Sequence, residues 1–404
     1  MNQRYNPLIT SREMMINALS RRRFIRYASL AAGAVATTKL ASCAAGPTTS
    51  EAGTATPAAS GSGKTLRILS WAGYDEADVI GPFEAATGAK VEFKTYVGGE
   101  QMLQFLNQSP AGTFDGIISD GEYVVKLMEL GAIAPLDTAD FTTLSDYNAV
   151  YKEFAGFYQG DQMMAVGTRF GNYGIAFNTK FLKPEDVTSW EVLARPDLQG
   201  KVGFFDWYLP NMGNASLALF PDNPNPYDLT DEQLLQVKEW LVKIKPNVAL
   251  ITPNIQDITN AFINESIVAG PVGDWLIQNA IADGHDNFAA VVPQEGSIRW
   301  SEGATLCAAS QNPELALEWV KYMSTPEAQA RIANANAYKG LAPNTKAPDH
   351  MSADEKTLLG YIPDPNNSGK LLVDSQLERS RARQLPVNQP EQVWQDYYNE
   401  FKTS

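Results

Sequence analysis

The hydrophobic pattern of residues 65–131 alternates between short apolar runs and runs with helical spacing. Three segments have the compact or alternating apolar pattern of strands: 65–71, 89–97 and 114–121. Three others place apolar residues at helical intervals or end at a glycine: 75–88, 98–109 and 122–131. The resulting β-α-β-α-β-α order predicts parallel pairing in an α/β sheet.

The middle of the chain repeats this logic without a fixed-period repeat. Strands are predicted at 172–178, at a segment ending in Asp206-Trp207, at 247–251 and at 266–272. Helices are predicted at 231–246 and 258–265, and the buried face of the first is expected to carry Leu234, Leu235, Val237 and Leu241. These elements predict a second α/β lobe.

Aromatic, acidic and glycine residues gather where the predicted strands end. Ligands of open α/β sheets bind beyond the carboxyl ends of the strands. The first lobe presents there Trp71, Tyr74, Gly98, Gly99, Asp120 and Glu122, and the second presents Asp206, Trp207, Asp274 and Trp275. Taken singly, each residue is better explained as a cap or a core aromatic; Asp120, for instance, could simply cap the helix that follows it. The convergence of several such residues favours a binding function.

The N-terminal segment has the pattern of a secretion signal. Four arginines lie within Ser20–Arg26, which resembles the twin-arginine export motif, and a run of small apolar residues follows. Leu40–Cys43 resembles a bacterial lipobox, so residues 1–43 are expected to be a signal with lipidation at Cys43. The alternative is an ordinary signal with an accidental cysteine.

A tether is expected behind Cys43. Residues 44–64 consist almost entirely of Ala, Gly, Ser, Thr and Pro. Such a segment cannot bury enough apolar surface to offset its ordering entropy. The pattern therefore predicts a globular body from residue 65 onward, held at a membrane surface by lipid.

Charge and residue usage narrow the function classes. Residues 1–43 carry seven basic side chains and one acidic one, so the rest of the chain has a formal charge of −20, which disfavours nucleic acid as a partner. Cys307 lies in an apolar run and is expected in the core. His285 and His350 have neither metal-like spacing nor a neighbouring nucleophile, so no metal, no cofactor and no catalytic residue is predicted.

The body resembles the solute-binding lipoproteins of bacterial ABC importers, within them the spermidine/putrescine-binding branch. The markers are SWAGY, KTYVGGEQM, FDGIISDGEYVVKLMELGAIAPLD, YGIAFNTKFLKPEDVTSWEVLARPDLQGKV, VVPQEGSIRW and YKGLAPN, in this order. The resemblance implies an α/β fold of two lobes, each a mixed sheet flanked by helices, which close on a ligand.

The resemblance also implies lobe boundaries. Two hinge crossovers are placed near Val166–Tyr173 and near Pro271–Leu276. Lobe 1 is then formed by 65–170 and 276–323, and lobe 2 by 171–275 and 324–404.

By position, the resemblance implies a set of ligand-binding residues: Trp71, Tyr74, Asp120, Glu122, Asp206 or Trp207, Asp274, Trp275, Trp300 and Glu302. Arg169, at the first crossover, departs from what a cationic ligand requires. An arginine there suits a carboxylate by bidentate pairing. It is equally explained as a hinge residue paired with an acid outside the site.

The ligand implied is a small linear polyamine, such as spermidine or putrescine, delivered to a permease with its ATPase subunits. Carboxylates would hold its ammonium ends and aromatic faces its methylenes. A zwitterionic or carboxylate ligand (amino-acid or opine-like) read by Arg169 is the alternative within the binding class. A receptor for a membrane sensor and an enzyme are the alternatives from other classes. We expect a monomer, lipid-anchored in the periplasm or at the cell surface after twin-arginine export.

Overall fold

The computed structural model describes residues 61–404, which belong to one compact unit. The predicted signal, Cys43 and residues 44–60 of the predicted tether lie outside the described residues. Among residues 61–404, no helix is both long enough and apolar enough to span a membrane.

The first part of the chain forms the predicted parallel β-α units. Strand β1 (Thr65–Ser70) pairs in parallel with β2 (Lys90–Thr95) and with β3 (Gly116–Asp120). The helices that connect and follow these strands are α2 (Ala77–Thr87), α3 (Gly99–Gln108) and α4 (Gly121–Glu129). Helix α2 ends as predicted at Gly88, whose φ of 71° requires the left-handed conformation that glycine adopts without strain.

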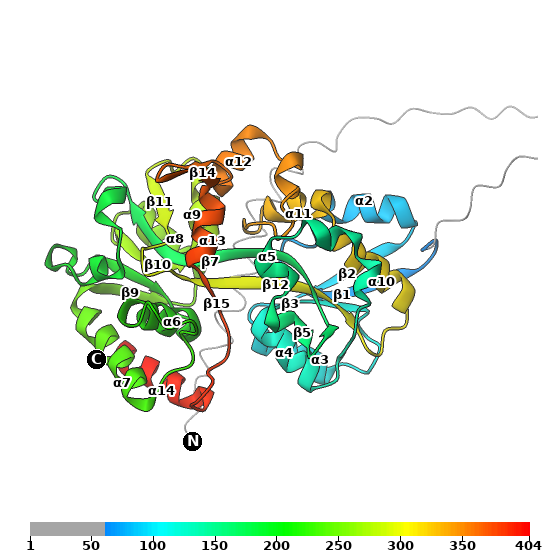
Figure 1. Ribbon diagram of the computed structural model, residues 1–404, viewed down its shortest axis with the longest axis horizontal. Coiled ribbons are helices and arrows are strands. Elements are labelled where there is room, and N and C mark those ends of the chain that lie inside the picture. Colours follow the sequence, from blue (N-terminus) through cyan, green and yellow to red (C-terminus); the bar gives the residue numbers. More distant parts are fainter. Residues whose placement is uncertain (1–60) are drawn as a thin grey trace, which may run out of the picture. The chain divides into compact units, whose positions relative to one another are not determined.

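Two long strands join this part to the rest of the sheet. Strands β7 (Val166–Asn178) and β12 (Ile298–Cys307) are antiparallel, and β12 also pairs with β3. The strand order is β2-β1-β3-β12-β7-β10-β8-β9. Figure 1 shows β7 and β12 running side by side between two groups of helices. All thirteen residues of β7 are buried, so this connection is part of the core.

The second part of the sheet continues from β7. Strand β10 (Ala269–Gly273) pairs with β7 and with β8 (Val202–Phe205), which pairs with β9 (Val248–Thr252). The associated elements are α6 (Tyr208–Leu219), α7 (Asp231–Ile244), α8 (Ile255–Ile263), α9 (Asp274–Ala282) and β11 (Phe288–Val291). The shorter elements of the first part are β4 (Ile133–Ala134), α5 (Ala149–Lys152), β5 (Tyr158–Gln159) and β6 (Gln162–Met163).

Helix α7 forms as predicted, but one residue of its expected buried face is wrong. A capping box between Thr230 and Gln233 fixes its start. Leu235 is 38% exposed, whereas Trp240 and Ile244 complete the buried face. The buried face of α7 is therefore turned towards Trp240 and away from Leu235.

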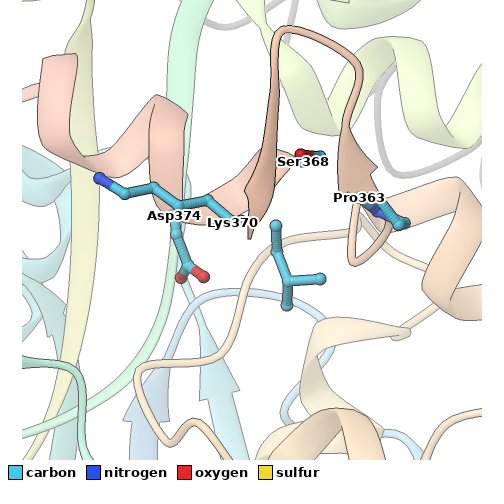
Figure 2. Close-up of a pocket in the computed structure, with 6 residues that line it drawn as sticks. Pro363, Ser368, Lys370 and Asp374 are labelled. Atoms are coloured by element: carbon cyan, nitrogen blue, oxygen red, sulfur yellow. The ribbon is translucent and has the colours of Figure 1, made fainter.

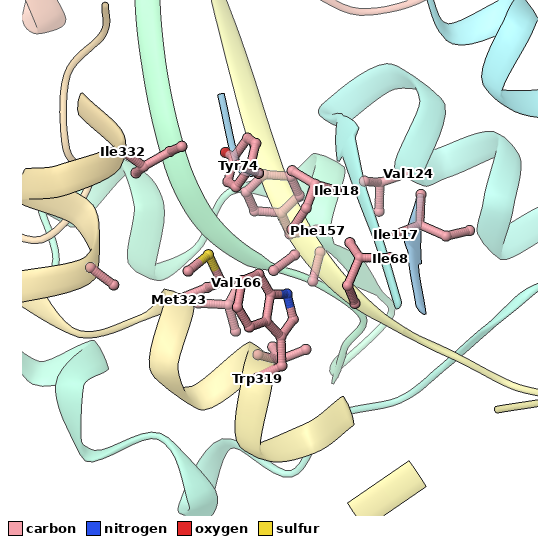
Figure 3. Close-up of a cluster of buried hydrophobic side chains, with 14 of the residues drawn as sticks. Ile68, Tyr74, Ile117, Ile118, Val124, Phe157, Val166, Trp319, Met323 and Ile332 are labelled. Carbon is pink, nitrogen blue, oxygen red and sulfur yellow. The ribbon is translucent and has the colours of Figure 1, made fainter. Parts of the chain in front are cut away.

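The buried side chains form two hydrophobic clusters, and these correct the predicted boundaries. The first cluster takes in residues from 66–170 and also from 304–377. Figure 3 shows part of it, with Trp319 near Val166 and Met323. The second cluster takes in residues from 173–300 and 394–401. Residues 276–300 therefore pack with lobe 2, and 328–377 with lobe 1, the reverse of the expectation.

The predicted position of the second crossover, near Pro271–Leu276, is also wrong. Strand β10 lies wholly among lobe 2 strands, and α9 continues the second cluster. The chain passes to the first cluster along β12, whose pairing with both β3 and β7 makes it the second connection.

The C-terminal part returns across both clusters. It contains α10 (Pro313–Met323), α11 (Pro326–Ala333), α12 (Ala353–Leu359), β13 (Pro363–Asp364), β14 (Asn367–Leu371), α13 (Leu372–Arg379), β15 (Arg381–Ala382) and α14 (Glu391–Thr403). Strand β15 pairs in parallel with the start of β12. This pairing brings the residue after it, Arg383, beside the ends of β3 and β8.

Candidate ligand-binding site

Cross-strand register places three charged residues side by side. Glu302 on β12 lies opposite Asp120 on β3 and opposite Arg169 on β7. Neighbouring strands are about 4.8 Å apart, so directly opposed side chains interact. The strands alone therefore assemble acids and a base that are far apart in the sequence.

Arg169, Glu302, Tyr74, Tyr338 and Trp300 form one buried group, which we call the hinge cluster. Arg169 Nε lies 2.9 Å from Glu302 Oε2, and both side chains are almost fully buried. Tyr74 donates its hydroxyl to Glu302 Oε2 at 2.8 Å, and Tyr338 donates to Oε1 at 2.7 Å. The guanidinium carbon lies 3.9 Å from the centroid of the Tyr338 ring and 5.8 Å from that of Trp300.

Most hydrogen-bond donors of Arg169 bind other groups of the protein. Its Nη1 donates to the carbonyl oxygens of Tyr338 (2.9 Å) and Ile332 (3.2 Å). Its Nη2 has no hydrogen-bond partner among the described residues. Burial acts to lower the pKa of Arg169, but the charges of Glu302, Tyr338 and Tyr74 and the hydrogen bond to Glu302 together outweigh it, and the pKa is raised. The hinge cluster is therefore a charge-balanced pair with one donor to spare.

Arg383 lies at the centre of a second group, which we call the Arg383 cage: Asp120, Glu122, Tyr173 and Trp207. Arg383 Nε lies 2.6 Å from Glu122 Oε1, and Nη2 lies 3.0 Å from Asp120 Oδ1. Its Nη1 donates to the Tyr173 hydroxyl at 2.9 Å. The guanidinium carbon lies 4.3 Å from the centroid of the Trp207 ring.

Asp120 does not act as the helix cap that was the alternative explanation. It occupies the N-cap position of α4, but its side chain accepts no hydrogen bond from the helix. Its Oδ2 has no partner among the described residues. Burial raises the pKa of Asp120 well above its ordinary value, and the charges of Glu122 and Glu302 raise it further, although Arg383 opposes this shift.

Asp274 is a half-buried carboxylate held by backbone groups. Its Oδ2 accepts the Asn172 N–H and its Oδ1 accepts the Trp275 N–H, both at 2.8 Å. Burial raises the pKa of Asp274 to about 7, and these N–H groups and the Trp300 side chain only partly offset the effect. Within residues 61–404, no Lys or Arg forms an ion pair with it.

The remaining predicted aromatics pack on neighbouring rings. Trp71 lies 4.8 Å from Tyr96 between ring centroids, and Trp275 lies 6.1 Å from Tyr338. Tyr338 thus links the hinge cluster, of which it is a member, to Trp275.

Asp206 and Trp207, the two alternatives for one position of the predicted site, lie in different surroundings. Asp206 pairs with Lys402 of α14 at 3.1 Å, and both side chains are partly exposed. Trp207 stacks on Arg383. Only Trp207 therefore lies with the other predicted site residues.

Three residues of these groups were missed in the sequence: Tyr173, Tyr338 and Arg383. Tyr338 lies within the YKGLAPN marker, which offered a signal. Arg383 lies in a polar stretch, and only the pairing of β15 with β12 reveals its position.

Two cavities lie apart from these groups. One of about 290 Å³ lies by the β13–β14 hairpin and is lined by Pro363, Ser368, Gly369, Lys370, Leu371 and Asp374 (Figure 2). The other, of about 100 Å³, is lined by ten residues that include Phe170 and Tyr361. Neither is lined by a predicted ligand-binding residue.

Family comparison agrees with this fold. The chain belongs to the bacterial extracellular solute-binding protein family, whose model matches residues 78–359. A relative, the spermidine/putrescine-binding periplasmic protein 1 of Haemophilus influenzae, is 25% identical over 314 residues, which are 78% of this chain and 84% of the relative.

Solved structures share the two-lobe architecture. The spermidine/putrescine ABC transporter substrate-binding protein PotD from Streptococcus pneumoniae superposes with a TM-score of 0.71 at 18% identity, covering 84% of this chain and 99% of that chain. The protein MotA from A. tumefaciens B6, solved in complex with glucopine, has a TM-score of 0.60 at 18% identity, with 84% and 99% covered. The predicted two-lobe binding-protein fold is confirmed.

Proposed function

We propose that this protein is the substrate-binding component of an ABC importer and that its ligand is a small linear polyamine. The family match gives a solute-binding role, and a relative with 25% identity is described as binding spermidine and putrescine. Its partners would be a permease and its ATPase subunits. A sensor-linked receptor would use the same ligand site.

The observation that carries the ligand class is an excess of negative charge on buried and half-buried side chains. The two groups and Asp274 together hold four carboxylates: Asp120, Glu122, Asp274 and Glu302. Only two guanidinium groups, Arg169 and Arg383, are paired with them among the described residues. Two carboxylates therefore lack a full counter-ion, and a dication would supply the missing charge.

The two under-compensated acids are Asp120 and Asp274. Asp120 is buried and Asp274 is half-buried, and each has a raised pKa. An uncompensated buried carboxylate is costly, and an ammonium brought next to it restores the charged form. Aromatic rings beside them, including Trp300 and Trp207, could pack against the methylenes of such a ligand and form cation–π contacts with its ammonium groups.

Ligand capture would involve closure of the two lobes on β7 and β12. Hinged closure around a ligand buries charge pairs that are hydrated in the open state. Small-angle scattering should show compaction on ligand addition. An unchanged radius of gyration with binding confirmed independently would contradict closure.

A zwitterionic ligand is the second candidate, on one specific observation. Arg169 Nη2 is buried without a partner among the described residues, so it could donate to a ligand carboxylate. The rest of Arg169 is engaged by Glu302 and two carbonyl groups. That engagement leaves one donor where bidentate recognition needs two.

We also propose that the chain is exported, cleaved before Cys43 and lipid-anchored at that cysteine. The support is the order of the arginine motif, apolar run and lipobox-like Leu40–Cys43. Intact-mass analysis of membrane-extracted protein should give a chain beginning at a lipid-modified Cys43. A mature chain that keeps Arg21 and Arg22 or carries an unmodified Cys43 contradicts this.

The ligand proposal is tested by native mass spectrometry of protein purified without denaturation. We expect a bound mass of a di- or triamine that is lost on denaturation and restored by added putrescine. A bound mass of an amino acid or an opine would contradict the polyamine proposal while leaving the solute-binding role intact.

A further inference from the structure

Arg383 has the surroundings that a cationic ligand group would require. Two carboxylates, one hydroxyl and one indole face contact its guanidinium group, and the side chain is 1% exposed. These contacts include three residues predicted from the sequence to bind ligand: Asp120, Glu122 and Trp207. A side chain of the protein thus holds the place expected for a ligand ammonium.

The contacts of Arg383 come from both parts of the fold. Asp120 ends β3 and Glu122 follows it, whereas Tyr173 belongs to the second hydrophobic cluster and Trp207 packs against it. Arg383 itself belongs to neither cluster. It therefore lies where the two lobes meet, and a ligand between the lobes would compete with it for the same carboxylates.

A short extended segment delivers Arg383 to this place. The N–H of Arg381 donates to the Ser297 carbonyl at 2.9 Å, and the N–H of Arg383 donates to the Arg299 carbonyl at 2.8 Å. The register of β15 on β12 is thereby fixed directly before the cage. The backbone position of Arg383 is therefore set by hydrogen bonds that do not depend on its own side chain.

We propose that Arg383 is a built-in cation that permanently fills one cation subsite of the ligand site, and so restricts the ligand to a short diamine. This inference rests on the proposed function. With Arg383 in place, two carboxylates remain for a ligand. Without it, the cage carries Asp120 and Glu122 unneutralised next to Trp207, and the ligand site gains room and charge for a third ammonium.

The effect of removing Arg383 distinguishes a built-in cation from a side chain that only stabilises the fold. A side chain that only stabilises the fold can be replaced without changing which length of polyamine is preferred. A built-in cation, when removed, leaves a vacancy with the shape and charge of a guanidinium group. Such a vacancy should bind small guanidinium compounds and should shift selectivity towards longer polyamines.

The first arm of the test uses methylguanidinium, which does not depend on the native ligand. Calorimetry should detect binding to Arg383→Ala at millimolar concentration and none to the wild type. Arg299→Ala is the matched control, because Arg299 is also buried but donates to Ser380 outside the cage. Equal binding to both variants, or to neither, overturns the proposal.

The second arm compares putrescine with spermidine. We expect the ratio of spermidine to putrescine affinity to rise at least tenfold in Arg383→Ala and to stay within twofold in Arg299→Ala. An unchanged ratio in Arg383→Ala overturns the length restriction. Arg383→Gln, which keeps most of the side-chain volume, should shift the ratio in the same direction and replaces Ala if that variant does not fold.

The two arms distinguish this inference from the proposed function. Failure of the wild type to bind either polyamine would refute the polyamine proposal and with it the length restriction. Methylguanidinium binding by Arg383→Ala would still show that the cage is a cation subsite filled by the protein.

Discussion

The hinge cluster and the Arg383 cage use the same chemistry in different ways. Each has a buried arginine, a carboxylate and aromatic rings. In the hinge cluster, Arg169 and Glu302 are direct cross-strand partners on β7 and β12, and three protein donors satisfy Glu302. In the cage, Arg383 comes from the C-terminal segment and is shared between Asp120 and Glu122.

This difference indicates that the hinge cluster stabilises the fold and that the Arg383 cage responds to ligand. A balanced pair within one strand ladder has no charge left for a ligand. A cation shared by two acids at the lobe boundary leaves negative charge uncompensated, and lobe opening can rehydrate it. We therefore expect stability to depend more on the hinge cluster, and ligand selectivity more on the cage and Asp274.

The largest effect is expected from Arg169→Met. Removing one partner of a buried ion pair leaves the other buried and unpaired, which costs about 3–5 kcal/mol. Urea denaturation should show a loss of this size in the free energy of unfolding. Arg383→Met should lose less, because water can reach Asp120 and Glu122 when the lobes separate.

A double variant controls this prediction. Arg169→Met with Glu302→Leu removes both charges, so it should recover part of the loss. The comparison fails if the double variant is as unstable as the sum of the two single variants, or if Arg383→Met is the more destabilising of the two arginine variants.

Asp274→Asn should have the next largest effect, on ligand affinity. Losing one member of a desolvated charge pair costs about 2–5 kcal/mol, which is roughly thirtyfold to several thousandfold in affinity. Calorimetry with putrescine measures it. Asp206→Asn is the control, because its pairing with the partly exposed Lys402 predicts little change. Similar losses in both variants would remove Asp274 from the site.

The raised pKa of Asp274 predicts a pH dependence of stability. The pKa is 3.8 in its ordinary state and about 7 in the folded protein, so between these values the folded state binds more protons. Stability should therefore fall as pH rises from about 4 to about 7, by at most about 1.4 kcal/mol per pH unit from this group. Urea denaturation of ligand-free protein at several pH values measures this.

Asp120 also titrates abnormally, so the informative quantity is the difference between the wild type and Asp274→Asn. The free energy of unfolding of Asp274→Asn should therefore fall less than that of the wild type as the pH rises. Superimposable pH profiles for the two proteins would show that Asp274 is ionised at neutral pH without cost.

The smallest effect concerns Trp207. The cation–π contact with Arg383 is worth about 0.5–2 kcal/mol, so Trp207→Leu should lower the free energy of unfolding by that contact in addition to lost apolar burial. Trp207→Phe keeps an aromatic face and should lose less. Identical losses in the two variants would indicate that the stacking on Arg383 contributes nothing.

The sequence predicted local structure well where the pattern itself carries the cause. The order of β1 to α4 follows from apolar periodicity, and Gly88 ends α2 because its backbone is left-handed. Helix α6 was not predicted, because its polar and glycine residues are buried and it shows no amphipathic stripe.

The site was predictable only in part. Strand ends indicated Asp120 and Asp274, since a parallel sheet brings such ends to one edge. The partners of these acids depend on which strands meet, and β12 and β15 join segments that are far apart in the chain. The lobe boundaries failed for the same reason, because residues 328–377 return to the first cluster through tertiary packing alone.

We infer that the ligand site of this solute-binding protein lacks two positive charges. The most direct test is a titration of the wild type with two ligands of equal length, putrescine and 4-aminobutanoate. They differ at one end, where the protonated aminomethyl group of putrescine is replaced by a carboxylate in 4-aminobutanoate. We predict that putrescine binds at least thirtyfold more tightly, since 4-aminobutanoate would leave one buried acid uncompensated. Tighter binding of 4-aminobutanoate would contradict the account and assign the site to zwitterions read by Arg169.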